Sequence, residues 1–360
     1  MQIFINISIT FALMFWPFLF AMSPMMLDSP GSENDKSHLI RMMLILSYPI
    51  GIFLLLWLFG GNYFSVRGFT LFTISTVVIA IAFLAFGYYS MLSNLTRGIA
   101  NSGYSIADNR AYYDGKSIDG ADSKSFTVLE EMESNFSASV YAKDRKHFYY
   151  AGAIVEGVIS GNFQKTIINQ DTYWVNSTQV IYMDRILPGA NPDNFSGFEG
   201  FNRWTYSISN NKFMAYYSGK PLPDVDRKTF TPLNDFFAKD SNYIFEQEKI
   251  ILSDAEADSF MILDDHDYGR DNNHIYYLSH LQPFAIKDID PESFEILGGG
   301  FLRDKNHIYF THQYKSIEKL EHVDITSFEV THYDDSTNSN ANDKNHYYYD
   351  EKIVGNKGGL

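Results

Sequence analysis

A seven-residue pattern that recurs along most of the chain constrains the fold more than any other feature. It reads Asp304-Lys305-Asn306-His307-Ile308-Tyr309-Phe310. Aligning its aromatic pair with the rest of the sequence gives eight unit starts, 29 to 39 residues apart: Ala107, Asp144, Asn176, Asn211, Asp240, Asp271, Asp304 and Asp343. A unit of this size cannot bury its own apolar face, so neighbouring units must stack. The pattern therefore predicts an all-β tandem-repeat domain over residues 99–360, with about eight units.

Each unit is expected to open with a tight β-hairpin. Branched and aromatic residues fill three successive positions, which favours a strand, and X-Gly pairs such as Asp114-Gly115 suit the turn that follows. Further on, an acid or Asn precedes a Phe by four residues, as Asp290 precedes Phe294, and would cap one helical turn. A closing strand follows that Phe. We expect three short strands per unit, arranged as an open β-solenoid or a propeller-like ring.

Residues 1–98 form a separate membrane domain in this interpretation. Three apolar stretches, near 3–22, 39–59 and 69–89, each have the ~20 residues that a helix needs to cross a bilayer. No Lys or Arg precedes the first stretch, so we expect an uncleaved span rather than a signal peptide. Pro17 and Pro49 lie inside spans, where neighbouring helices tolerate proline. The segment from Ser23 to His38 is predicted to be a short exposed connection.

The charge of the repeat region limits its partners. From residue 98 onward the chain holds 24 of its 28 basic and 40 of its 43 acidic residues. This acidic charge disfavours nucleic acid or anionic lipid as a partner of the repeats. There is no cysteine, which excludes disulfides and thiolate metal sites. The partners that remain are the lipid bilayer and a protein or glycan ligand on the repeat surface.

No stretch of the sequence predicts catalysis or a cofactor. The chain has no nucleophile elbow, P-loop, dinucleotide fingerprint or His-Glu-x-x-His motif. Four histidines, at 147, 274, 307 and 346, share one repeat offset, so we expect them to bond within their own hairpins. The acidic stretch 264–271 offers Asp265, Asp267 and Asp271 as weak candidate calcium ligands. It lacks the EF-hand pattern, and a solvated loop between repeats is the preferred interpretation.

The recurring Asp-Lys-Asn-x-x-Tyr-Tyr, followed by x-Gly-Lys and a later Phe, resembles the bacterial DKNYY repeat family. The resemblance covers roughly residues 100–355, and the units at Asn176 and Asp240 depart from it by lacking the double tyrosine. Membership in this family, whose function is uncharacterised, implies a repeat fold and a location in the bacterial envelope. It implies no catalytic residues.

The leading functional hypothesis is a non-enzymatic protein of the bacterial inner membrane whose repeats present a binding or scaffolding surface. One alternative is an envelope glycan hydrolase that uses a carboxylate pair. Another is a sensor whose spans relay binding to a membrane partner. The family resemblance places the repeats outside the cytoplasm. The distribution of basic residues gives a weak bias toward the opposite orientation. Three of them, Lys36, Arg41 and Arg97, flank the spans on the repeat side, against Arg67 and the terminal amine on the other side, so the sidedness of the repeats stays open.

Overall fold

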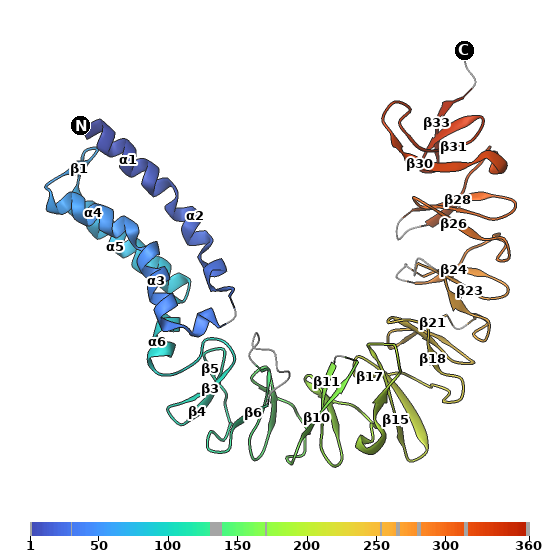
Figure 1. Ribbon diagram of the computed structural model, residues 1–360, viewed down its shortest axis with the longest axis horizontal. Coiled ribbons are helices and arrows are strands. Elements are labelled where there is room, and N and C mark those ends of the chain that lie inside the picture. The colour runs from blue at the N-terminus through green and yellow to red at the C-terminus, as the bar shows by residue number, and fades with distance from the viewer. Residues whose placement is uncertain are drawn as a thin grey trace. The chain divides into compact units, whose positions relative to one another are not determined.

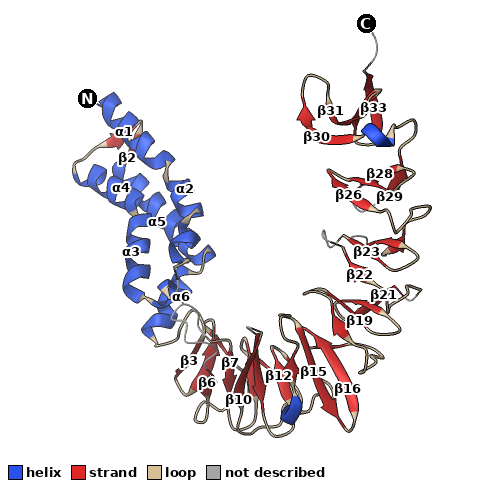
Figure 2. Ribbon diagram, turned by 45° about the vertical axis from the view of Figure 1, so that its right-hand side comes forward, coloured by secondary structure: helices blue, strands red, loops and turns tan. Residues whose placement is uncertain are grey.

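The computed structural model describes residues 2–29, 31–129, 139–169, 171–252, 254–263, 267–278, 282–312 and 316–357. Helices occupy its N-terminal part, and eight small β-sheets follow in chain order (Figures 1 and 2). Contacts divide the chain into two compact units, Met1–Thr166 with Thr172–Ile186, and Ile167–Asp171 with Leu187–Leu360.

The helical part contains two helices that are long and apolar enough to cross a membrane, or three if a bent pair counts as one. The two are Ile3–Ala21 and Gly68–Ala85, and the pair Lys36–Leu46 with Tyr48–Leu58 is bent by 51°. Prolines near the starts of α2 and α4 account for the breaks, since proline cannot donate the helical hydrogen bond. The elements of this part are α1 (Gln2–Met14), α2 (Trp16–Ala21), η1 (Ser23–Leu27), η2 (Ser32–Asn34), α3 (Lys36–Leu46), α4 (Tyr48–Leu58), β1 (Asn62–Tyr63), β2 (Val66–Arg67), α5 (Gly68–Ala85) and α6 (Tyr88–Thr96).

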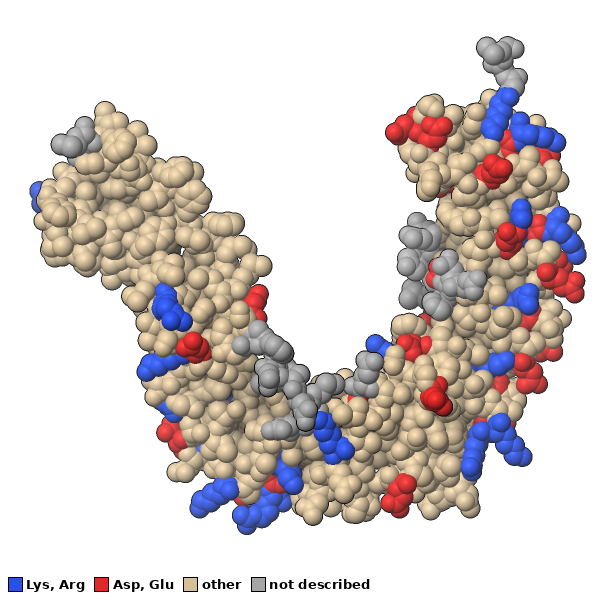
Figure 3. Space-filling model, in the orientation of Figure 1, with Lys and Arg blue, Asp and Glu red and all other residues tan. Residues whose placement is uncertain are grey.

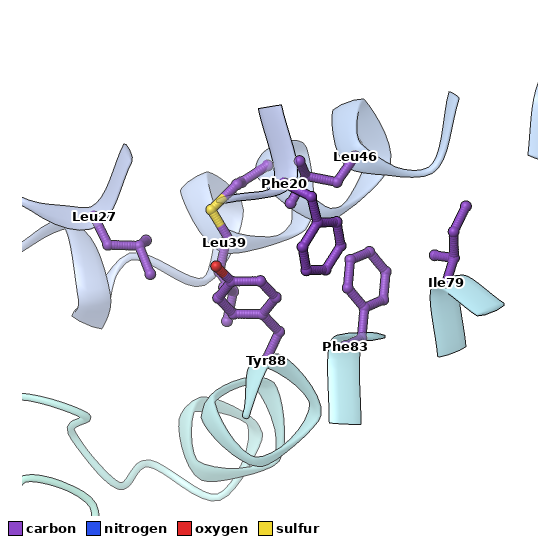
Figure 4. Packing of buried hydrophobic residues seen from close by; sticks show 8 residues of the cluster. Phe20, Leu27, Leu39, Leu46, Ile79, Phe83 and Tyr88 are labelled. Carbon is purple, nitrogen blue, oxygen red and sulfur yellow. The ribbon is translucent and has the colours of Figure 1, made fainter. Parts of the chain in front are cut away.

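One apolar cluster holds these helices together. Phe20, Leu39, Phe83 and Tyr88 pack in its centre (Figure 4), and the hydroxyls of Ser23 and Tyr88 lie 2.5 Å apart. Many other apolar side chains of the helices face outward. On the face drawn in Figure 3, most of the helical surface carries no charged side chain, whereas charges are scattered over the repeats.

The segment from Ser23 to His38 is largely exposed, as its polar sequence predicts, but it also bonds to the first repeat. Ser23 and Leu27 are buried, and Asn34 Oδ1 accepts the backbone N–H groups of Asn101 (2.7 Å) and Ser102 (3.1 Å). Short polar side chains bond readily to nearby backbone, and here they join the helical part to the first repeat.

Each repeat sheet except the first has four strands in chain order, so each is an antiparallel meander. We number the sheets in chain order. Sheet 1 is β3 (Tyr104–Ala107), β4 (Arg110–Tyr113), β5 (Lys116–Ser117); sheet 2 is β6 (Thr127–Leu129), β7 (Tyr141–Lys143), β8 (Phe148–Tyr150), β9 (Ala153–Ile154); sheet 3 is β10 (Gln164–Ile168), β11 (Asp171–Val175), β12 (Val180–Tyr182), β13 (Arg185–Ile186); and sheet 4 is β14 (Ser196–Gly197), β15 (Trp204–Ser209), β16 (Lys212–Tyr217), β17 (Lys220–Pro221).

The later sheets repeat this plan, and two short helical turns, η3 (Pro192–Asn194) and η4 (Ile325–Ser327), precede sheets 4 and 8. Sheet 5 is β18 (Thr231–Pro232), β19 (Phe237–Lys239), β20 (Ile244–Glu246), β21 (Lys249–Leu252); sheet 6 is β22 (Met261–Ile262), β23 (Tyr268–Arg270), β24 (Ile275–Tyr277), β25 (Phe284–Ala285); sheet 7 is β26 (Glu295–Gly298), β27 (Phe301–Arg303), β28 (Ile308–His312), β29 (Ser316–Lys319); and sheet 8 is β30 (Glu329–Asp334), β31 (Ser339–Asn342), β32 (His346–Tyr349), β33 (Lys352–Asn356).

The predicted hairpin of each unit is present, but three strands per unit was wrong. The predicted pairing of the aromatic strand with the short strand is confirmed, for example Tyr149 opposite Ile154. A further strand lies just before each Asp, and it pairs with the strand after the preceding Phe, as Lys143 pairs with Thr127. Each sheet therefore straddles the boundary that the aromatic alignment placed at the Asp. Within the described ranges no strand pairs with a different sheet, and neither a barrel nor a propeller is found.

Neighbouring sheets pack through alternating faces of their two central strands. Between sheets 7 and 8 the buried cluster joins Phe301, Ile308 and Phe310 to Ala341 and Tyr348. Successive side chains of a strand point to opposite faces, so Leu302 and Tyr309 instead face sheet 6. Within each of the two compact units, every gap between neighbouring sheets therefore holds its own small core, and the repeats depend on their neighbours for stability.

Candidate functional site

The Asp that starts the repeat pattern is buried between two turns that it holds together, the turn that follows it and the turn that precedes its sheet. We call this hydrogen-bonded arrangement a joint. Only 2% of Asp304 is exposed. Its Oδ1 accepts the backbone N–H groups of Asn306 and His307, both at 2.7 Å. Its Oδ2 accepts the N–H of Asp290 at 2.9 Å and the hydroxyl of Tyr309 at 3.2 Å. One carboxylate thus closes the turn between β27 and β28 and ties it to the turn that precedes the sheet.

The same joint recurs at fixed offsets. Asp144, Asp240, Asp271 and Asp343 are each at most 6% exposed and accept the same pair of turn N–H groups. Each also accepts one N–H from the preceding turn. Buried carboxylates require such complete hydrogen bonding. The recurring aspartates are therefore structural acceptors.

A serine or threonine completes the joint. It lies directly before the Phe that follows the acid of the preceding turn, and the sequence analysis missed it. The hydroxyl of Ser327 donates to Asp324 Oδ1 at 2.7 Å and accepts the N–H of Lys344 at 3.0 Å. The equivalent residues are Ser125, Thr229, Ser259 and Ser293. The sequence signal that could have revealed it is a Ser or Thr directly before the Phe in each of these five units.

Basic residues on either side of the Asp have separate partners. The residue after it pairs with the acid of the preceding turn, as Lys344 pairs with Asp324 at 2.6 Å. The residue before it reaches the next repeat, since Lys239 Nζ donates to the carbonyls of Asp258 (2.8 Å) and Phe260 (2.9 Å). Burial lowers the pKa of Lys239. The first cation therefore binds the preceding turn to the joint, and the second binds one repeat to the next.

The histidines of the pattern lie in separate repeats and do not converge. Each donates its backbone N–H to the Asp of its own joint, and each Nδ1 lies 3.3–3.5 Å from a tyrosine hydroxyl of the same hairpin. The prediction that they bond within their hairpins is confirmed.

In three of the joints, hydrogen bonding holds the pKa of the buried aspartate below its usual range. Burial alone would raise the pKa of Asp271, but the Tyr276 hydroxyl and three backbone N–H donors together hold it below its usual range. The pKa values of Asp144 and Asp343 are lowered by the same kind of bonding against the effect of burial. Burial and the neighbouring carboxylate raise the pKa of Tyr276. A carboxyl group with a depressed pKa is a poor general acid near neutral pH.

Of the three weak calcium candidates, Asp265 lies outside the described residues. Asp271 is the centre of a joint, with both carboxylate oxygens hydrogen-bonded. Asp267 accepts the N–H of Leu278 through its backbone carbonyl, at 2.7 Å. In the described part of the chain, no three His, Cys, Asp or Glu side chains are grouped to hold a metal ion.

Three cavities lie between neighbouring sheets, on the side of the first strands. The largest, about 590 Å³, is lined by Leu297, Gly298 and Gly299 of sheet 7 and Val330, Thr331 and His332 of sheet 8. A second, about 570 Å³, lies between β22 and β26, where Arg270 and Glu295 are its charged lining residues. The third, about 380 Å³, separates sheets 4 and 5 and includes Asp235. Each of the three has at most one carboxylate among its described lining residues.

The model of the DKNYY family matches residues 104–249 and 206–352 of this chain. No curated protein and no solved structure matches it. The matched segments together cover more than half of the chain and contain every joint described above. The chain belongs to the DKNYY family.

Proposed function

We propose that this protein is anchored in the bacterial inner membrane by its helices and binds a partner along the open edges of its repeat sheets. The helices support the anchoring, because they are apolar along lengths that fit a bilayer and many of their large side chains face outward. The partner is a protein segment in extended conformation, with a glycan as the other outcome of the test.

The first-strand edges carry this proposal. Among the described residues, the first strand of each four-stranded sheet pairs on one side only, so its other side offers backbone N–H and C=O groups to an added strand. β30 is the longest of them, and it pairs with β31 through Glu329, Val330 and Asp334. Thr331 and His332 lie between these pairs, are exposed, and line the cavity of about 590 Å³ between sheets 7 and 8.

A photo-crosslinking amino acid at Thr331 tests this proposal in cells. The expected result is a discrete crosslinked adduct at position 331. Its mass spectrum should contain peptides of one partner protein, or sugar fragments if the partner is a glycan. Lys249, exposed on the last strand of sheet 5, is the matched control and should give no adduct. Equal adducts at both positions, or none at either, would contradict binding at the first-strand edge.

A second candidate function, a sensor, is favoured by the bonding between helices and repeats. Asn101 Nδ2 donates to the carbonyls of Glu33 (3.0 Å) and Met91 (3.1 Å), and its Oδ1 accepts from Asn94. Arg97 forms an ion pair with Asp108 at 2.7 Å. Movement of the first repeat would therefore be passed to the ends of the helices.

Replacing Asn101 with Ala tests this sensor function. If the function depends on the junction, N101A should keep the Thr331 crosslink but cause the same change in the cells as deletion of the protein. An N101A variant that behaves like the wild type in both assays would remove the sensor. For the hydrolase, the described cavities offer no carboxylate pair that would favour it.

The repeats are proposed to lie outside the cytoplasm, as the family resemblance implies. An alkaline phosphatase fusion after residue 357 should be active and a fluorescent-protein fusion dark. The reverse result would place the repeats in the cytoplasm.

A further inference from the structure

We propose that sheet 8 is a capping repeat, which ends the stack of sheets and prevents a second copy of the chain from stacking on it. One face of sheet 8 packs against sheet 7 through Ala341 and Tyr348, both fully buried. Ala341 is opposite Tyr348, and Asn342 is opposite Tyr347. Because side chains alternate along a strand, Asn340, Asn342, Tyr347 and Tyr349 belong to the other face, where Tyr349 is 45% exposed.

The position three residues before the joint Asp shows the change most clearly. In sheets 2, 3, 5, 6 and 7 it is aromatic and at most 5% exposed: Tyr141, Tyr173, Phe237, Tyr268 and Phe301. In sheet 8 it is Asn340. The Asn340 amide donates to Asp350 Oδ1 and accepts the Asp350 N–H, both at 2.9 Å. In sheets 2, 5, 6 and 7 the side chain at this position packs against the next sheet, whereas in sheet 8 it is bonded within its own sheet.

The position one residue before the joint Asp changes in the same way. Lys143, Lys239 and Arg270 there donate to backbone carbonyls of the next repeat, and Arg303 of sheet 7 pairs with Glu295 of its own sheet. Sheet 8 has Asn342 instead, which accepts a hydrogen bond from Lys357. The ammonium group of Lys357 lies 4.9 Å from the centre of the Tyr347 ring, a distance at which a cation and an aromatic face attract. The C-terminal segment thus covers part of this face with a charge.

A polar outer face on the terminal repeat is what keeps a repeat stack soluble and finite. An apolar face at this place would be a template for a second copy, because it would carry the same side chains that bind sheet to sheet inside the stack. On β31, two asparagines and the bound Lys357 replace the aromatic residue and the cation of the inner sheets, which lowers that complementarity although Tyr347 and Tyr349 keep the aromatic positions of β32. The assignment rests on the fold alone and holds whichever function the repeats serve.

Restoring the repeat pattern tests the cap. The double variant N340F/N342K gives sheet 8 the aromatic residue and the cation of the inner sheets, and N340A/N342A is its matched control. The full-length chain is purified in detergent, and its mass is measured by light scattering over a hundredfold range of concentration. We expect the restored variant to at least double its mass as concentration rises, while the wild type and the alanine control keep one mass.

Two results would overturn the cap. One is a folded N340F/N342K protein, with wild-type circular dichroism, whose mass follows that of the wild type. The second comes from the wild type itself, which keeps the experiment decisive if the variant does not fold. A lysine-reactive crosslinker applied to a mixture of isotope-labelled and unlabelled chains should give no Lys357–Lys357 link between copies. Such a link at low protein concentration would make this face an interface.

Discussion

The joint aspartates should be far more important for local stability than their exposed neighbours, and Asp271→Asn tests this with the smallest change of shape. The joint geometry indicates which hydrogen bonds survive. Asn176 occupies the joint of sheet 3 and still accepts two turn N–H groups through Oδ1, so the bonds from Asn273 and His274 should persist. The new Nδ2 group cannot accept a hydrogen bond. The Tyr276 hydroxyl (2.6 Å) and the Glu256 N–H (2.9 Å) therefore lose their acceptor.

The expected cost follows from those two bonds. A hydrogen bond to a charged group contributes about 1.5–3 kcal/mol, so losing two costs about 3–6 kcal/mol before relaxation. Taking the lower end, about 3 kcal/mol, amide exchange that needs opening of sheet 6 should accelerate on the order of 100-fold. Hydrogen exchange read by mass spectrometry is the suitable assay, because a repeat stack need not unfold in one step.

The control and the refuting result are equally specific. Glu292→Gln makes the same chemical change at an exposed position of a neighbouring turn and should leave exchange within about twofold of the wild type. Peptides of sheet 2 should be unaffected in both variants. If D271N exchanges sheet 6 no faster than E292Q does, the carboxylate does not hold the joint and the structural interpretation of the repeated aspartate fails.

Three further predictions concern the same stack. Lys239→Met should cost about 1–2 kcal/mol, because two carbonyls of the next repeat lose their donor. Amide hydrogen exchange in residues 256–262 should then be roughly tenfold faster, and K228M should not show this increase. Gly152→Ala should lower the melting temperature, because Gly152 has φ +79° and a Cβ there would lie 2.7 Å from Tyr113 Cβ. The control G161A should leave the melting temperature unchanged, because a Cβ at Gly161 would meet open space. Because Asp144, Asp271 and Asp343 have lowered pKa values, the stability that these three joints add is complete above the unfolded pKa of about 3.9 and is lost as the pH falls through the lower folded values. An acid titration followed by circular dichroism should therefore show no loss until below about pH 4, and a loss between pH 5 and 7 would contradict this assignment.

The sequence predicted the periodic features well because each depends on local chemistry. The hairpin turns are one example: Asp114 and Gly115 both have positive φ, as do Ala151 and Gly152, which is what an X-Gly turn requires. The family assignment and the helical N-terminal part were likewise confirmed. The fourth strand was missed because its partner lies across the boundary of the sequence period, so only the paired sheet reveals it.

The departures from the pattern could not be interpreted without the pairing. Ile181 replaces an aromatic residue of the third strand, and the structure places Trp174 directly opposite it. In sheets 2 and 5 the corresponding pairs are Ala142 with Tyr149 and Ala238 with Phe245. The large and small side chains have exchanged strands, so the volume between them is filled either way.

Glu246 has no such compensation within its sheet. It stands where most units have Tyr, and it is opposite Phe237 and Lys249. Burial raises its pKa, and the charge of Lys249 opposes that rise. The cavities were also beyond sequence reasoning, since they depend on how one sheet stacks on the next.

The central claim is that every four-stranded sheet begins after the Phe of one unit and ends after the hairpin of the next. Because the chain has no cysteine, a pair of introduced cysteines reports this order directly. Glu295 and Arg303 are opposite each other on β26 and β27, close enough for a disulfide. Lys319 lies on β29, three strands from β26, or about 14 Å away. Under mild oxidation E295C/R303C should form an intramolecular disulfide and E295C/K319C should not. A disulfide in the second variant, or none in the first, would contradict the sheet order on which this account rests.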